Sequence, residues 1–207
     1  MTTAVLLGAA AVLGLAGCTE SRAGDASAAT TSTTPSRSPT SSSASASAPK
    51  VANPLDASRF LTDPCASISP GLLQRFGLPL QGRANTTGPI AEHIGPGCLW
   101  IAPTAIHNSA DVGYLKGNKN GLTDTYRGHE RGSFQGYWEP TMVDGYPAVF
   151  NGPPPDKRLQ GDCNITVGIS DTLTFRVSAM QWETKHLACE RTRQVAAAVI
   201  ATMKGVG

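Results

Sequence analysis

Cysteine is the residue type with the clearest chemical meaning in this chain, and its five copies fall into two groups. Cys18 closes the sequence LAGC after an apolar run, whereas Cys65, Cys98, Cys163 and Cys189 are spread over the rest of the chain. None of these four is spaced as C-x-x-C, the pattern typical of zinc and redox sites. An even number of cysteines in an exported chain indicates two disulfides, for which three connectivities are possible. We expect Cys65 to pair with Cys98 and Cys163 with Cys189, because each pair closes a loop of a few tens of residues.

The other residue patterns that resemble catalytic motifs give little support for an enzymatic function. Residues 47–50 read SAPK, the Ser-x-x-Lys spacing of penicillin-recognising enzymes, but the companion motifs of those enzymes are missing. His93 and His129 each have a glutamate as a direct neighbour, and neighbouring side chains on a strand or helix point in different directions. The sequence has no G-x-S-x-G, H-E-x-x-H or phosphate-loop pattern. We therefore expect no catalytic residue, no metal site and no cofactor.

Aromatic and basic residues between positions 137 and 158 are a better candidate for a functional surface. Tyr137, Trp138 and Tyr146 lie on one predicted hairpin, and the Pro-rich loop after it carries Lys157 and Arg158. Aromatic rings beside a rigid loop can form a surface for a partner or ligand. The alternative is that the rings fill the core between sheet and helix. Exposure of Tyr137 or Trp138 to solvent distinguishes the two.

The N-terminus has the composition of an export signal. Residues 4–16 are apolar or small, and this run is too short to cross a bilayer as a helix. The LAGC sequence at its end resembles the bacterial lipobox, whose cysteine is lipidated and becomes the first residue of the mature chain. We expect residues 1–17 to be a lipoprotein signal peptide, and Cys18 to anchor the protein on the extracytoplasmic face of the cell membrane. Residues 1–3 lack the Lys or Arg typical of such signals.

Residues 18–54 are rich in Ser, Thr and Ala, and residues 19–49 contain no large apolar side chain. Such a segment buries too little surface to offset the entropy of ordering, so we expect a disordered tether with a root-mean-square span of roughly 30 Å. A single globular domain should then occupy residues 55–207. The net charge of +2, with no cluster of Lys and Arg, argues against binding to nucleic acid.

Two segments of the expected domain have clear periodicity. Residues 163–177 alternate apolar and polar side chains on either side of a Ser-Asp break, which predicts two antiparallel strands with one buried face. Residues 186–205 predict a long terminal helix that ends at a glycine, and its apolar stripe needs a sheet to cover. The stripe consists of Cys189, Thr192, Val195, Ala196, Val199, Ile200 and Met203.

Shorter signals complete the expected fold. Residues 69–77 have the Ser-Pro start and Gly end of a short helix, residues 98–103 and 110–117 predict strands, and residues 122–131 predict a second short helix. The Asp144-Gly145 dipeptide between apolar runs predicts a hairpin. The resulting fold class is α+β, an antiparallel sheet of about five or six strands. A short N-terminal and a long C-terminal helix pack on one of its faces.

Several short motifs together carry a family resemblance. They are the lipobox, the Ser/Thr tether, DPC (63–65), CLW (98–100), VDGYPAVF (143–150), CNITVGIS (163–170) and CERTRQVAAAVIATMKG (189–205). With these motifs the chain resembles the actinobacterial lipoprotein family catalogued as domain of unknown function 3558. The resemblance implies a cell-envelope lipoprotein of a Gram-positive actinobacterium and a relation to PsbP-like folds. It implies no activity, because the family has none assigned.

The sequence thus favours a lipid-anchored domain that acts as a non-catalytic binding or accessory module of the cell envelope. One alternative is a carrier or sensor of a small envelope ligand, such as a lipid, sugar or peptide, with its pocket between sheet and helix. Another is a hydrolase with an unfamiliar site. The expected partners are the membrane, through the lipid, and an envelope protein or small ligand.

Overall fold

The computed structural model describes residues 47–103, 105–181 and 184–206, with the backbone alone for residues 105–107 and 185. The expected signal peptide, the lipidated Cys18 and residues 19–46 of the expected tether lie outside the described residues.

A sheet of seven strands, all antiparallel to their neighbours, forms the centre of the domain. The strands are β1 (Arg83–Asn85), β2 (Gly97–Ala102), β3 (Ala105–Tyr114), β4 (Tyr137–Val143), β5 (Tyr146–Gly152), β6 (Asp162–Ser170) and β7 (Leu173–Gln181). Their order is β1-β2-β3-β7-β6-β5-β4. The α+β class is confirmed, with seven strands in place of about five or six. The edge strand β1 escaped the sequence analysis because its three residues are all exposed and show no alternation.

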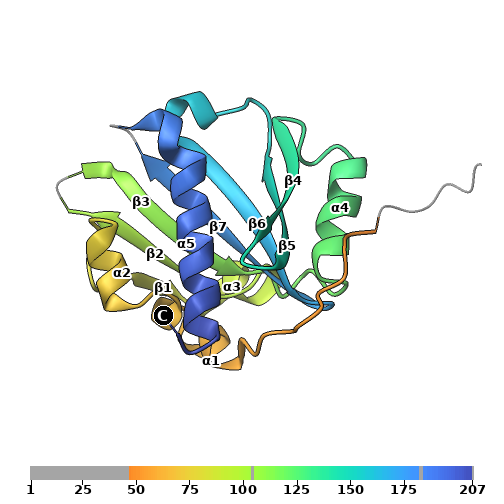
Figure 1. Ribbon diagram of the computed structural model, residues 1–207, viewed down its shortest axis with the longest axis horizontal. Coiled ribbons are helices and arrows are strands. Elements are labelled where there is room, and N and C mark those ends of the chain that lie inside the picture. The colour runs from red at the N-terminus through yellow and green to blue at the C-terminus, as the bar shows by residue number, and fades with distance from the viewer. Residues whose placement is uncertain (1–46, 104, 182–183, 207) are drawn as a thin grey trace, which may run out of the picture. The chain divides into compact units, whose positions relative to one another are not determined.

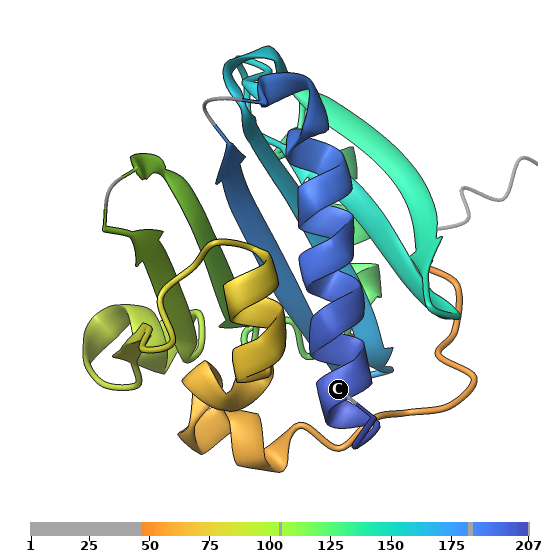
Figure 2. The same cartoon turned by 60° about the vertical axis from the view of Figure 1, so that its left-hand side comes forward.

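Helices lie on both faces of this sheet (Figures 1 and 2). They are α1 (Ser58–Thr62), α2 (Pro70–Arg75), α3 (Gly88–His93), α4 (Leu122–Glu130) and α5 (Ala188–Met203), with short 3-10 turns η1 (Pro64–Ser67), η2 (Arg158–Gln160) and η3 (Lys185–Leu187). The predicted short and long helices, α2 and α5, share one face. Helix α4 lies behind the sheet in Figure 2, so the opposite face is partly covered as well.

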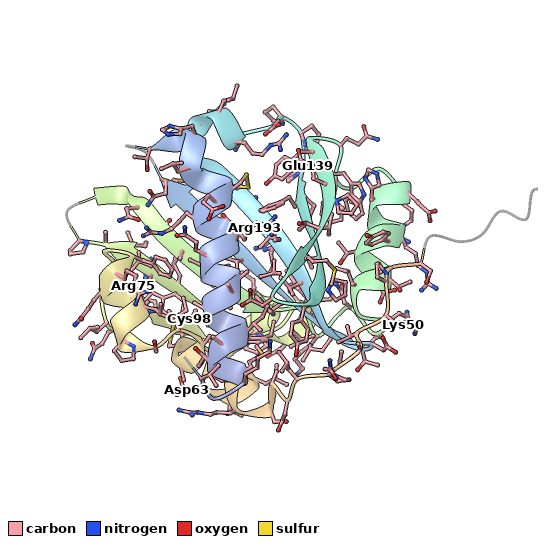
Figure 3. All side chains as sticks on the ribbon, viewed as in Figure 1. Lys50, Asp63, Arg75, Cys98, Glu139 and Arg193 are labelled. Carbon is pink, nitrogen blue, oxygen red and sulfur yellow. A yellow bond between two sulfur atoms is a disulfide. The ribbon has the colours of Figure 1, made fainter. Side chains whose placement is uncertain are left out.

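The core lies between the sheet and α5. Ile165, Val167 and Ile169 of β6 are fully buried, as the alternation predicts, and they lie on the same face as Phe175 and Val177 of β7. Helix α5 adds its predicted stripe, of which Val195, Ala196, Val199 and Ile200 are fully buried. Arg193 of α5 donates hydrogen bonds to the Met142 carbonyl (2.8 Å) and the Thr141 hydroxyl (2.9 Å) of β4, which extends the contact to the sheet edge (Figure 3).

Two disulfides fasten the helices of this face to the sheet. Cys65 of η1 is bonded to Cys98 of β2, and Cys163 of β6 to Cys189 of α5. These are the two pairs that the sequence analysis expected. A bridge that closes a loop of this size typically stabilises a fold by about 3 kcal/mol.

The β4-β5 hairpin turns at Asp144 and Gly145, which have φ angles of 47° and 86°. Two consecutive positive φ angles define the type I′ turn that suits the twist of a hairpin, and Asp-Gly adopts it readily. Pro140 lies in β4, the outermost strand, where a missing backbone N–H removes no essential ladder bond.

The described chain begins with residues 47–56, here called the N-terminal strap. The Ala48 amide donates to the Thr123 hydroxyl at 3.4 Å, Lys50 pairs with Asp171 at 3.1 Å, and the Leu55 amide donates to the Ile169 carbonyl at 2.9 Å. The strap therefore approaches the domain on the α4 side, away from Arg75 of α2 (Figure 3). The expected boundary between tether and domain, after residue 54, falls inside this packed segment.

Candidate functional site

The face of the sheet opposite α5 carries a cleft of about 430 Å³, here called the polar cleft. Its floor is formed by Asn151, Asp162, Asn164, Thr166, Arg176 and Ser178. Its sides are formed by Leu115, Asn118, Asp124, Thr125, Gly128 and Phe134 near α4, and by Tyr137, Gly152, Pro153, Pro154, Pro155 and Lys157 near the Pro-rich loop. This volume lies within the range of small-molecule sites in proteins.

The strand period places the polar side chains on the floor. In β6 the residues between the core positions are polar or small, and they point away from α5. Thr166 lies opposite Arg176 of β7 in the register, and Asn164 lies opposite Ser178. Neighbouring strands are about 4.8 Å apart, so these side chains form one continuous polar surface.

Asn151 has the most constrained polar side chain of the floor, with 3% of its surface exposed. Its Nδ2 donates to the Thr166 hydroxyl at 2.9 Å and to the Val149 carbonyl at 3.2 Å. Within the described residues, Oδ1 accepts no hydrogen bond. Since both N–H groups are used by the protein, the amide presents its oxygen as an acceptor to the cleft that it lines.

Asn118 repeats this arrangement at the side of the cleft. Its Nδ2 donates to the hydroxyl of Thr125 in α4 at 3.1 Å and to the hydroxyl of Thr174 in β7 at 3.0 Å. Both threonines are buried. The Asn118 oxygen has no hydrogen-bond donor among the residues that the structure describes. Two amide oxygens are thus fixed in place and open to a ligand.

Tyr137 closes the end of the cleft where β5 separates from β6. The two strands pair only from Ala148 to Phe150, so the backbone N–H of Asn164 has no strand partner. The Tyr137 hydroxyl accepts that N–H at 2.9 Å and Asn164 Nδ2 at 3.1 Å, and Ser178 donates to Asn164 Oδ1. Burial raises the pKa of Tyr137, although the two hydrogen bonds from Asn164 oppose the shift.

Charges of both signs line the cleft. Among the described residues, the Arg176 side chain has only a long contact with Asp111, at 3.9 Å, and the Lys157 ammonium makes no hydrogen bond or ion pair. Burial raises the pKa of Asp162, while Lys157 and Arg176 act to lower it. Asp124 is bonded to Arg127 at 3.2 Å. The two cations and two carboxylates that line the cleft cancel in formal charge.

An aromatic cluster supports the α4 side. Trp138 of β4 stacks on His129 of α4, with centroids 4.1 Å apart and planes within 2°, and Tyr126 meets the same indole edge-on at 5.0 Å. The ring of Phe134 lies 6.0 Å from Trp138 and lines the cleft. The cluster fastens α4 to the sheet edge, so it fixes the position of the Phe134 wall.

The five residues of the expected binding surface do not lie together. Tyr137, which is buried, and Lys157 line the polar cleft. Arg158 covers the Tyr137 ring at 4.3 Å while pairing with Glu139 and Asp156. Trp138 lies behind Phe134, half-buried in the aromatic cluster. Tyr146 is buried on the other face of the sheet, beneath Lys204 at 4.9 Å.

Most residues of the polar cleft were missed by the sequence analysis, which singled out none of Asn118, Asn151, Thr166 and Ser178. The signal was the polar half of the alternation in β6 and β7. Such positions are typical of a sheet face in water, whereas α4 and the Pro-rich loop cover part of this face. Among the described residues, no three His, Cys, Asp or Glu side chains lie close enough to hold a metal ion.

The fold and the cleft define a class of protein, a disulfide-bonded α+β domain with a helix-covered core on one sheet face and a polar cleft on the other. The chain belongs to the family described as Protein of unknown function (DUF3558), whose model matches residues 13–202. Comparison with curated proteins and with solved structures gives no match. Across the described ranges, no helix is both long and apolar enough to cross a membrane.

Proposed function

We propose that this protein is a lipid-anchored, non-catalytic binding module of the cell envelope that takes a small polar ligand into the polar cleft. The observation that carries the proposal is the pair of open amide oxygens on Asn118 and Asn151. The protein's own hydrogen bonds hold each amide with its oxygen facing the cleft, so a ligand that donates to these oxygens requires no rearrangement of the two side chains.

The hydroxyl groups of the cleft support a role without catalysis. Ser178 donates to the amide oxygen of Asn164, and Thr166 accepts from the amide of Asn151. An amide cannot act as a general base at neutral pH, so neither hydroxyl is activated as a nucleophile. These contacts favour binding over hydrolysis.

The anchor rests on the N-terminal sequence. An apolar run of signal-peptide length is followed by LAGC and a Ser/Thr-rich segment, and the family model begins at residue 13, so its match includes Cys18. Intact mass of the protein from a native membrane fraction tests this part. We expect a diacylated chain that starts at Cys18, and release of the Cys18→Ala variant from the membrane. An unmodified chain would contradict the anchor.

Binding is tested by nuclear magnetic resonance with a panel of envelope-type compounds, comprising monosaccharides, dipeptides and a short-chain glycerolipid. We expect at least one compound to shift the side-chain amide signals of Asn118 and Asn151. The matched control is Gln194, whose amide lines an open groove between α2 and α5. Shifts confined to Gln194 and that groove, or shifts nowhere, would overturn the proposal.

A further inference from the structure

We infer that the ligand of the polar cleft is a neutral saccharide unit, an inference that rests on the proposed function and specifies its ligand. The two open amide oxygens and the Asp162 carboxylate are acceptors, and the guanidinium of Arg176 and the ammonium of Lys157 are donors. Each of the five lines the same cleft.

Hydroxyl groups match this mixture better than other polar groups do. A hydroxyl both donates and accepts, so a polyol can satisfy the amide oxygens of Asn118 and Asn151 and the donors of Arg176 at the same time. A carboxylate or a phosphodiester group has no proton to give and leaves the amide oxygens without partners. An ammonium group accepts nothing and leaves Arg176 without one.

The charge of the cleft also disfavours an ionic ligand. Lys157 and Arg176 are offset by Asp124 and Asp162, and Arg176 additionally faces Asp111 at 3.9 Å. An anion gains from the two cations but is repelled by the nearby carboxylates, and a cation meets the reverse. A neutral ligand incurs neither repulsion.

The walls of the cleft suit a ring with apolar faces. Phe134 forms one side, and the run Pro153 to Pro155 forms another. The C–H faces of a sugar ring can pack on such walls while its hydroxyls reach the polar floor. A lipid chain would instead cover the floor amides without bonding to them, which is unfavourable.

An extended peptide is disfavoured by the sheet itself. Peptides commonly bind by adding a strand to a free sheet edge. The polar cleft lies over β6 and β7, which are interior strands of the sheet, and where β5 separates from β6 the Tyr137 hydroxyl already accepts the N–H of Asn164. A peptide in the cleft would have few backbone partners.

The test uses glucose, galactose, mannose, arabinose and N-acetylglucosamine as neutral probes, with glucuronate, glucosamine and tri-alanine as charged or peptide comparisons. Each is added at about 10 mM, which nearly saturates a site with a millimolar Kd. The signals followed are the side-chain amides of Asn118 and Asn151 and the Arg176 Nε–H. We expect one neutral sugar to shift all three, with a Kd at least tenfold lower than that of the comparisons.

Variants show whether the cleft is the site. We expect Arg176→Gln and Phe134→Ala each to weaken binding of that sugar at least tenfold, while Arg83→Gln on the exposed strand β1 leaves it unchanged. Arg176 is half-exposed and has no close partner, so its variant should fold even if Phe134→Ala does not.

Three results would overturn the inference. The first is no response of the cleft to any neutral sugar, and the second is tighter binding of glucuronate, glucosamine or tri-alanine. The third is sugar binding that Arg176→Gln leaves intact. With the second result the proposed function survives, because the cleft still binds a ligand. Failure of the proposed function itself requires that no compound of the wider panel shifts Asn118 or Asn151.

Discussion

Ile165 and Thr166 are neighbours in β6, yet they belong to two different environments. Ile165 points toward α5, into a core of aliphatic and aromatic side chains. Thr166 is as deeply buried on the other face, where its hydroxyl accepts a hydrogen bond from Asn151. One strand thus carries apolar packing on one face and a hydrogen-bonded amide site on the other.

The difference indicates which face supplies stability and which face suits the recognition role that we propose. Burial of apolar surface under α5 stabilises the fold without requiring any particular contact geometry. Buried amides and hydroxyls contribute little net stability, and each must find a partner of the right geometry. A domain that needed only a second core would fill the α4 side with aliphatic side chains, and the polar floor found there instead supports the proposed ligand site.

The largest expected effect is on the helix-covered face. Ile165→Ala removes a fully buried side chain and leaves a cavity, so the free energy of unfolding should fall by about 2–5 kcal/mol. Urea unfolding followed by circular dichroism measures this change. The amide signals of Asn151 should remain in place in the folded variant. A loss below about 1 kcal/mol would show that this face is not the main source of stability.

The second expected effect concerns the bridge between β6 and α5. The double variant Cys163→Ala, Cys189→Ala should lower the free energy of unfolding by about 3 kcal/mol, because the unfolded chain regains the entropy of an open loop. Thermal unfolding measures this change. The variant tests the helix-covered face alone, since neither cysteine lines the polar cleft. Displacement of the cleft signals would contradict the separation of the two faces.

A smaller effect is expected across the strand. Thr166→Val keeps the shape of the side chain but leaves one N–H of Asn151 without its acceptor, at a cost of about 1–3 kcal/mol. The Asn151 amide signals should move and ligand binding should weaken, in contrast to Ile165→Ala. Chemical denaturation and ligand titration measure the two effects. If Thr166→Val binds the ligand as tightly as the parent protein does, the polar face is not the binding face.

The smallest effect concerns the edge of the polar face. Burial raises the pKa of Asp111, and Arg176 only partly offsets this. A carboxyl whose pKa is higher in the folded than in the unfolded state makes its full contribution to stability at pH values below the unfolded-state pKa, near 3.9. This contribution is lost as the pH rises through the folded-state pKa. Asp111→Asn should therefore raise Tm at pH 7 and lose its advantage below about pH 4.

Calorimetry at several pH values measures this difference, with the exposed Asp63→Asn as the matched control. A variant that is less stable than the parent protein at pH 7 would show that the contact with Arg176 outweighs burial.

Much of the helix-covered face could be predicted from the sequence, because its signals are local. The alternation around Ile165 shows the strand period, and the apolar stripe around Val199 shows the helix period. The Asp144-Gly145 dipeptide indicates its turn type within two residues. The cysteine pairing was predicted from the short loops that the two disulfides close. The N-terminal strap was missed, because Ala48 and Lys50 look like the Ser/Thr segment before them.

The polar cleft could not be predicted in the same way, because its parts meet only in three dimensions. Asn118, Asn151 and Arg176 come from three separate segments, and a polar residue on an alternating strand is usually exposed. The sequence predicted a helix at 122–131 but gave no sign of which sheet face it covers. The aromatic residues were noticed, but the face to which Trp138 and Tyr146 belong depends on the register of β4 and β5.

The positions of the two disulfides along the chain have a consequence for proteolysis. The paired cysteines are 33 and 26 residues apart in the sequence, and the first pair encloses β1 and the exposed side of α3. A single cut inside either loop leaves both fragments covalently joined, so a nicked molecule loses no part of the chain until it is reduced. A protease that cleaves near Ile90 would thus leave the cleft strands β5, β6 and β7 uncut, and the cleaved protein would remain one molecule.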